Sequence, residues 1–272
     1  MIKHVIGINL RGIGVLSDFI KTPNLFYFKK CVFYFNPLCN RNYCLLPAGV
    51  PNEPETHIFL ENIIKASSDQ ITFIDIGASI GEFVIPLAKF DKVKACYAFE
   101  PNEEAAKSIV ISALINNLGD KIIVSTSAVS SYDGEGLFYL NTKSPTGSKL
   151  VADPQQSMKY KVVKVSKLDS IFQNQLFNAI ILIDVEGSEL EVLKGGREFI
   201  LRNNPLIIFE YNEVTKSVFK LEQVYELFPK NQWALFRLRK DGLLDQNFSY
   251  TWNLVLCNKN SVFYKICLEM LK

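Results

Sequence analysis

The sequence predicts an α/β fold, in which a mostly parallel sheet carries helices on both faces and ends in a C-terminal antiparallel hairpin. Apolar runs of strand length alternate with helical stretches from residue 55 onward, which is typical of parallel strands joined by crossover helices. Four apolar runs end in an acid: Asp75, Glu100, Asp184 and Glu210. Ligands of open α/β sheets bind at the carboxyl ends of the strands, so we expect the functional site at these acids.

The first half of the pattern contains three expected strands, Ile71–Ile76, Ala95–Phe99 and Ile122–Thr126. Helical spacing predicts one helix over residues 58–65 and another after Gly81. The helix after the second strand opens at Asn102, a good N-cap, and the helix dipole favours the two glutamates of its first turn. We expect Gly119 to close this helix and one apolar stripe to face the core: Ala106, Ile109, Val110, Ala113 and Leu114.

The second half continues with two strand-like stretches, residues 136–140 and 160–165, on either side of a turn-rich loop at 141–156. Two continuous apolar runs, Ala179–Ile183 and Leu206–Phe209, are expected to be buried strands. The helix between them should begin with Ser188, with Glu191 three residues later completing a capping box. The closing hairpin would pair Trp233–Leu238 with Trp252–Cys257 around Lys240, Asp241 and Gly242.

The most informative segments read FIDIGASIG, residues 73–81, and ACYAFEPN, residues 95–102. A strand ending in Asp75 leads into a glycine-bounded turn, and the next strand ends in Glu100, about 20 residues after the turn, as in nucleoside-binding α/β units. The spacing from Gly77 to Gly81 is G-x-x-x-G, which lacks the third glycine that a pyrophosphate requires. An adenosine without phosphate, as in S-adenosylmethionine (SAM), fits better, with Glu100 accepting hydrogen bonds from the ribose. The alternative is an ordinary tight turn.

Composition sets the broad class. The 272 residues are 48% apolar and 21% charged, with a formal net charge of +2, which indicates a globular protein with no strong attraction to nucleic acid. No apolar stretch is long enough to span a membrane and no signal peptide is evident. The six cysteines form no C-x-x-C pair, so we expect reduced thiols and a cytoplasmic protein. Zinc at Cys31, Cys39 and Cys44 is disfavoured because no second ligand pair follows.

The first 52 residues differ from the rest. Leu25–Phe35 is aromatic and β-prone but interrupted by Lys29 and Lys30, and prolines punctuate the stretch after it. We interpret residues 1–52 as an N-terminal extension packing on a domain at 53–272. Weak contact with a membrane surface is the alternative, although the stretch lacks a helical moment.

Asp184, Val185, Glu186 and Gly187 form the candidate reaction centre. Histidine is scarce, with His4 in the extension and His57 before the first core strand, from where it could line the pocket. We therefore expect a carboxylate base or a metal-activated hydroxyl. Asp184, Glu210 and Asn212 offer oxygen donors to a divalent cation such as Mg²⁺. The alternative is that Asp184 only caps the following turn.

The motifs FIDIGASIGEF, YAFEPN, SAVSSYDGEGLFYL, KLDSIF, ILIDVEGSELEVLKGG and PLIIFEYN occur in this order. From about Glu53 to Asn258 the chain resembles the FkbM family of SAM-dependent methyltransferases, and the run at 183–195 is a family signature. The resemblance implies a Rossmann-like class I methyltransferase acting on a hydroxyl of a small molecule, sugar or glycan. The catalytic residues we expect are Asp184, Glu186 and Glu210. The expected cofactor-binding residues are Glu53, Asp75, Gly77, Ala78, Gly81, Glu100, Pro101, Asn102 and Asp184.

One position departs from the family pattern. Members commonly carry a lysine two residues before the aspartate of the DVEG motif, and this chain has Leu182 there. If that lysine orients or neutralises the acid, this chain must supply another cation or work differently. A SAM- or nucleotide-binding module without catalysis is therefore one alternative function. A nicotinamide oxidoreductase is another, disfavoured by the missing third glycine.

Overall fold

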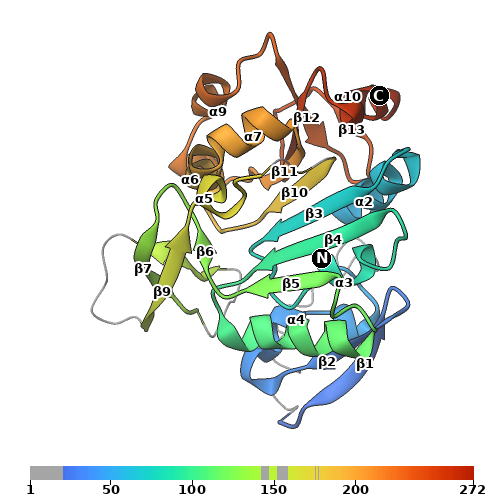
Figure 1. The fold of residues 1–272 in the computed structure, drawn as a ribbon, viewed down its shortest axis with the longest axis vertical. Helices are drawn as coiled ribbons and strands as arrows, with labels where there is room; N and C mark the ends of the chain where they lie inside the picture. Colours follow the sequence, from blue (N-terminus) through green and yellow to red (C-terminus); the bar gives the residue numbers. More distant parts are fainter. Residues whose placement is uncertain (1–20, 142–146, 152–158, 175, 177) are drawn as a thin grey trace.

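A computed structural model describes residues 21–141, 147–151, 159–174, 176 and 178–272. Its main sheet has eight strands in the order β13-β12-β14-β11-β10-β3-β4-β5 (Figure 1). The strands from β11 to β5 run parallel, whereas β14 is antiparallel to both β11 and β12. The predicted α/β class is therefore confirmed. The strand bounds are β3 Ile71–Ile76, β4 Val93–Phe99, β5 Ile122–Ser125, β10 Ala179–Ile183, β11 Leu206–Glu210, β12 Trp233–Leu238, β13 Leu244–Asp245 and β14 Asn253–Asn258.

Helices cover both faces of this sheet, and each face has its own apolar core (Figure 1). Phe73 of β3 belongs to one core and its neighbour Ile74 to the other, as the alternation of side chains along a strand requires. The first core includes residues of α2 Pro54–Ala66, α3 Val84–Leu87, α4 Glu103–Ile115 and α10 Val262–Glu269. The second includes residues of α5 Leu168–Ile171, α6 Glu189–Gly195, α7 Arg197–Asn203 and α9 Leu221–Leu227. A short helix, α8 Thr215–Val218, follows β11. No helix of the described residues is long and apolar enough to cross a membrane.

A second sheet lies at the carboxyl edge of the main one (Figure 1). It has the order β6-β9-β7-β8, formed by β6 Ala128–Val129, β7 Gly134–Tyr139, β8 Lys149–Val151 and β9 Tyr160–Ser166. Most of the loop expected at 141–156 lies outside the described residues. The sheet brings β8 within reach of the site-bearing strand ends.

The N-terminal segment folds as a hairpin against α4. Its strands are β1 Asn24–Phe28 and β2 Cys31–Phe35, followed by two 3-10 helices, η3 Pro37–Tyr43 and η4 Leu46–Ala48. Lys29 and Lys30, which the sequence presents as an interruption, form the turn with φ of 46° and 62°. Main-chain N–H groups of β2 donate to Asn116 Oδ1 at 3.1 Å and Ser112 Oγ at 3.0 Å on α4. The domain boundary at Asn52 stays a prediction, and His4 lies outside the described residues.

Three local expectations are wrong in detail. On α4, Val110 and Leu114 are 42% and 62% exposed, because the buried stripe is narrower than the sequence suggests. The helix ends at Ile115, and Asn117 turns the chain with φ 58° before Gly119 is reached. Residues 240–242 connect β12 to β13 and not to β14, although β12 and β14 do pair.

Ser188 is the N-cap of α6, as expected, but the capping box is absent. Its side chain makes no capping hydrogen bond. Glu191 instead accepts hydrogen bonds from Ser131 Oγ and Lys194 Nζ. The neighbouring Glu189 accepts from Val185 N and Gly187 N of the loop before the helix.

Candidate functional site

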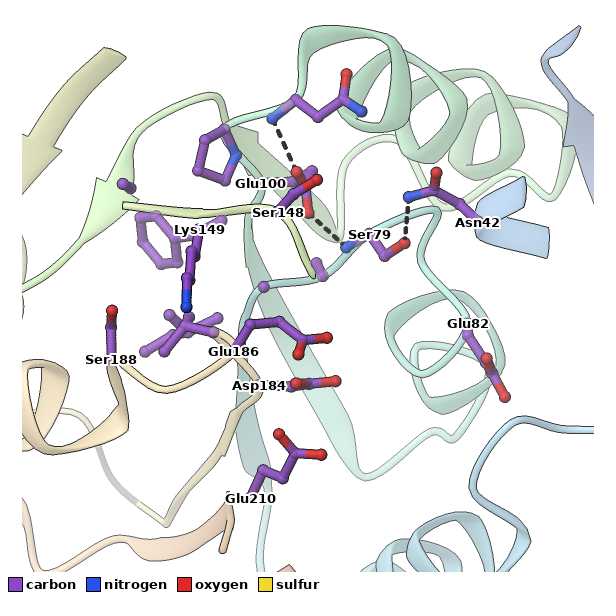
Figure 2. A pocket seen from close by; sticks show the side chains of 18 of the residues that line it. Asn42, Ser79, Glu82, Glu100, Ser148, Lys149, Asp184, Glu186, Ser188 and Glu210 are labelled. Carbon is purple, nitrogen blue, oxygen red and sulfur yellow. Dashed lines mark hydrogen bonds between the residues drawn. The ribbon is translucent and has the colours of Figure 1, made fainter. Parts of the chain in front are cut away.

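A cavity of about 500 Å³ opens at the carboxyl edge of the main sheet. The ends of β3, β4, β10 and β11 line it, together with β8 of the second sheet and part of η3 (Figure 2). Among the described residues that line it, the acidic and basic side chains are six carboxylates and two cations: Glu53, Glu82, Glu100, Asp184, Glu186, Glu210, Arg41 and Lys149. The cavity is therefore strongly acidic.

The glycine turn is shaped by the two strands beside it. Gly77 has φ of +88°, and the N–H groups of Gly77 and Ala78 donate to the Phe99 carbonyl of β4 at 2.9 and 3.1 Å. A Cβ on Gly77 would lie 1.8 Å from the carbonyl oxygen of Asp184. Glycine is thus required there by the approach of β10, in addition to lining the cavity. Gly81, with φ +84°, packs against side chains of α3 and α4 and does not line the cavity.

Glu100 is buried and fixed by backbone donors. Ser79 N donates to its Oε2 and Asn102 N to its Oε1, each at 2.8 Å (Figure 2). Burial raises the pKa of Glu100 to about 7, although both N–H groups act in the opposite direction. Pro101 and Asn102 line the cavity beside it, and Asn102 Oδ1 caps α4 by accepting from Glu104 N at 3.2 Å. The carboxylate is therefore positioned before any ligand binds.

Asp75 lies behind the turn and does not line the cavity. Its Oδ2 is buried without a hydrogen-bond partner. Burial, followed by the charge of Glu100, raises the pKa of Asp75 to about 8. Asp75 is thus a buried acid beneath the site.

Glu82 was not expected from the sequence, although it directly follows Gly81. Its carboxylate accepts from the Asn52 backbone N–H at 2.8 Å, from the Asn52 side chain, and bonds to His57 Nε2 at 3.0 Å. His57 lies behind it, outside the cavity lining, stacked on Phe83. Burial lowers the pKa of His57. His57 therefore supports Glu82 and does not face the cavity.

Asp184, Glu189 and Glu210 bring carboxylate oxygens within 4.8 Å of one another. Asp184 Oδ1 and Glu189 Oε2 are buried without a hydrogen-bond partner. Glu189 is fully buried, and its Oε1 accepts from Val185 N at 3.2 Å and Gly187 N at 3.1 Å. Burial and then the charge of Glu210 raise the pKa of Asp184 well above its usual range. Burial and then the charge of Glu186 raise the pKa of Glu210 to about 8.

The structure brings Asp184, Glu186 and Glu210 together as expected. The side-chain oxygen of Asn212, however, accepts from backbone N–H groups and does not join the group of acids. Asn212 Nδ2 donates to Glu210 Oε1 at 2.7 Å, and its Oδ1 accepts from Val214 N and Thr215 N. Glu189 takes its place in the oxygen-donor group. The sequence contained one signal for Glu189, because it is the third acid of the signature run at 183–195.

This chain has a leucine at the family's lysine position, and the cation near the acids comes from another strand, β8. Leu182 is buried inside β10, opposite Asp75 of β3. Lys149 of β8 lines the cavity beside Glu186 (Figure 2), and its charge lowers the pKa of both Glu186 and Glu189. Burial still dominates at Glu186 and raises its pKa to about 7. Sequence reasoning missed Lys149 because nothing in the order of the chain connects it with the DVEG loop.

Glu53 closes one side of the cavity at the start of α2. Its Oε2 accepts from Thr56 Oγ1 at 2.9 Å and from Asn253 Nδ2 at 2.7 Å. Burial raises the pKa of Glu53. These bonds connect α2 with β14 at the edge of the site.

A family model for the methyltransferase FkbM domain matches residues 75–232, more than half of the chain. The chain belongs to the FkbM methyltransferase family. The matched range contains the glycine turn, Glu100 and the acids of β10 and β11. It excludes η3 and Glu53, which also line the cavity.

The chain is similar to several solved structures. An FkbM methyltransferase from Methylobacillus flagellatus KT has a TM-score of 0.51 at 19% identity, over 79% of this chain and 52% of that chain. The present chain thus spans about half the length of that relative. An rRNA methylase from Streptococcus thermophilus scores 0.43 at 12% identity, covering 75% and 95%. An O-methyltransferase from Bacillus cereus, in complex with S-adenosylhomocysteine, scores 0.42 at 14%, covering 77% and 82%. No curated protein sequence matches the chain.

Family and fold together support SAM-dependent methyl transfer and confirm the class I methyltransferase architecture. The exclusion of nucleic acid that the near-neutral charge suggested has no support in these comparisons.

Proposed function

We propose that this FkbM-family chain is a SAM-dependent O-methyltransferase acting on a hydroxyl of a small molecule, sugar or glycan. The observation that carries the proposal is a single cavity with two different ends. At one end Glu100 is held by backbone N–H groups. At the other, Asp184 and Glu210 line the cavity and converge with the buried Glu189, and an oxygen of Asp184 and one of Glu189 lack partners. The first end suits a ribose, and the second suits removal of a proton from an acceptor.

The residues present fit SAM. The Glu100 carboxylate faces the cavity with each oxygen retaining a lone pair after its backbone bond, so it can accept from both ribose hydroxyls. Gly77, Ala78, Pro101 and Asn102 form the wall on either side of it. Bound SAM would supply a methyl group on a sulfonium, an intrinsically reactive donor. Asp75, buried beneath the turn, would act on the pocket without touching the cofactor.

Asp184, Glu186 and Glu210 are the acceptor-side residues in this proposal. An alcohol must lose its proton as the methyl group is transferred, and a base is most effective when its pKa lies near the working pH. The carboxylates of Glu186 and Glu210 have pKa values raised to about 7 and about 8. Asp184 lies between the glycine turn and Glu210, which favours it as the residue that receives the proton.

A divalent cation such as Mg²⁺ fits the same end of the cavity. Asp184, Glu189 and Glu210 would hold it through carboxylate oxygens, the ligands that hard cations prefer. The supporting observation is the buried Oε2 of Glu189, which has no partner although the residue is fully buried. A cation would pair with that oxygen and would lower the pKa of an acceptor hydroxyl.

Calorimetric titration with SAM, S-adenosylhomocysteine and NAD tests the cofactor. Binding of the first two without NAD supports the proposal, whereas NAD binding without a response to SAM would favour an oxidoreductase. Release of S-adenosylhomocysteine in the presence of hydroxylated acceptors then distinguishes an enzyme from a binding module. Chelator should stop that release and Mg²⁺ restore it if the cation is required, and activity in chelator would leave Asp184 as a direct base.

A further inference from the structure

The acidity of the cavity restricts where the amino-acid end of SAM can lie. That end carries an ammonium and a carboxylate, and every ionised acid of the lining repels that carboxylate at short range. The described residues offer two cationic side chains along the lining, Arg41 and Lys149. The choice between them fixes the direction in which the cofactor runs from its ribose.

Arg41 belongs to the side of the cavity that holds the ribose acid. It lies on η3, and its neighbour Asn42 donates through Nδ2 to Ser79 Oγ at 2.9 Å. Ser79 in turn donates its backbone N–H to Glu100 at 2.8 Å. Figure 2 shows this chain of bonds running from Asn42 through the glycine turn to Glu100. The segment bearing Arg41 is thus tied directly to the cofactor side.

Lys149 belongs to the opposite side. Figure 2 places its side chain by Glu186, away from Asn42. A ligand carboxylate at Lys149 would therefore lie beside the carboxyl group of Glu186, on the acceptor side.

We infer that Arg41 binds the methionyl carboxylate of SAM and that η3, outside the matched family domain, completes the cofactor site. The inference rests on the proposed function. A guanidinium presents a fork of N–H donors that matches a carboxylate. The backbone of η3, which bears Arg41, is held in place because Tyr43 at the end of η3 is fully buried. The Tyr43 hydroxyl donates to the Tyr34 carbonyl at 2.8 Å. Asn36 before η3 donates to Glu104 of α4 at 2.8 Å.

A comparison of two ligands tests the contact between Arg41 and the methionyl carboxylate. S-adenosylhomocysteine carries the amino-acid end, whereas 5′-methylthioadenosine shares the adenosine and sulfur but lacks it. Arg41→Gln should weaken S-adenosylhomocysteine binding by about tenfold or more, the usual effect of losing a charge-assisted bond. The same variant should leave methylthioadenosine affinity unchanged. Arg41→Lys, which keeps the charge, should bind S-adenosylhomocysteine with intermediate affinity, and it also serves if Arg41→Gln fails to fold.

Lys149→Gln is the matched control and should weaken neither ligand. Equal weakening of both ligands by Arg41→Gln would show a structural role and overturn the inference, as would no change in either. Selective loss of S-adenosylhomocysteine binding in Lys149→Gln would place the carboxylate on the acceptor side and also overturn it. A wild-type protein that binds both ligands keeps these outcomes separate from the proposed function. A wild-type protein that binds neither would overturn both.

Discussion

Two acidic regions lie at the cavity, Glu100 at one end and Asp184 and Glu210 at the other with Glu189 buried beside them, and the hydrogen bonding of their oxygens differs. Both oxygens of Glu100 accept backbone N–H bonds at 2.8 Å. In the group of Asp184, Glu189 and Glu210, Asp184 and Glu189 each keep a buried oxygen without a partner. An unsatisfied buried acceptor costs roughly 1–3 kcal/mol. Glu100 is therefore satisfied by the protein alone, whereas the acids of the acceptor side lack partners until a proton, a cation or an acceptor arrives.

The difference indicates that one region binds the cofactor and the other takes part in the reaction. A fixed carboxylate suits a cofactor of constant shape, because preorganised groups lose little freedom on binding. An incomplete set of acids suits the reacting end, where charge must change during the reaction and raised pKa values allow it. The two regions meet at the glycine turn, where β3 and β10 run side by side.

Replacing Gly77, where the two regions meet, should have the largest effect on the stability of the protein. In Gly77→Ala, the new Cβ would lie 1.8 Å from the Asp184 carbonyl oxygen, in a backbone with φ +88°. We expect a loss of more than about 3 kcal/mol in the free energy of unfolding, because rigid backbone lies on both sides of the collision. SAM binding should be lost as well. Urea unfolding followed by tryptophan fluorescence measures the loss.

Gly119→Ala is the control for this change. Its Cβ would meet only the end of the flexible Leu114 side chain, at 3.0 Å. Its stability should stay close to that of the wild type. A Gly77→Ala protein as stable as the Gly119→Ala protein would show that β3 and β10 can separate at this point, and the two regions would then be mechanically independent.

The next largest effect should come from a change on the acceptor side that lowers the reaction rate alone. Asp184→Asn keeps the shape of the side chain, so the fold and the affinity for SAM should persist. The rate of methyl transfer should fall by about 10²–10⁴-fold, the range for a lost general base. Single-turnover release of S-adenosylhomocysteine measures the rate. Full activity would leave the acceptor side without a named catalyst, and positioning alone would have to drive transfer.

The sequence predicts this layout best where local signals suffice. The expected bounds of β3 and β10 equal the observed ones, because β10 is a continuous apolar run and β3 is a mainly apolar stretch that ends just before Gly77. Glu100 is found at the end of its strand, since the strand pattern alone places it there. The width of the apolar stripe on α4 is wrong at Val110 and Leu114, because burial depends on what packs against the helix.

The sequence fails where two distant segments define a residue's role. Lys149 reaches the DVEG loop only through the folding of the second sheet against the first. Gly77 is required by the carbonyl of a residue more than 100 positions away. Lys29 and Lys30 read as an interruption because a turn of lysines at positive φ has no local propensity behind it. These features depend on tertiary contacts and not on local pattern.

The third effect tests the ribose side. Glu100→Ala should weaken SAM binding by about 1–3 kcal/mol, the usual cost of losing a charge-assisted acceptor. Calorimetry measures the dissociation constant, and Glu191→Ala, an acid of α6 that pairs with Lys194 outside the cavity lining, is the control. If folded Glu100→Ala binds SAM as the wild type does, the ribose must lie elsewhere and the contrast between the two regions loses its functional meaning.

The smallest expected effect is a pH dependence that belongs to the ribose side. Burial raises the pKa of Glu100 to about 7, above its ordinary value. The folded protein therefore holds this proton more tightly than the unfolded chain, and the stability that the proton contributes is lost as the pH rises through about 7.

The pH dependence of ligand binding has the opposite sign, because only the ionised carboxylate can accept from both ribose hydroxyls. The affinity for methylthioadenosine, which has no titrating amino-acid end, should fall as the pH drops from 8 to 6, by no more than about tenfold for one group. Glu100→Gln should bind more weakly and lose this dependence. A wild-type affinity that stays constant over this range would mean that neighbouring donors keep Glu100 ionised throughout, and the ribose side would then be even more rigidly prepared than the comparison implies.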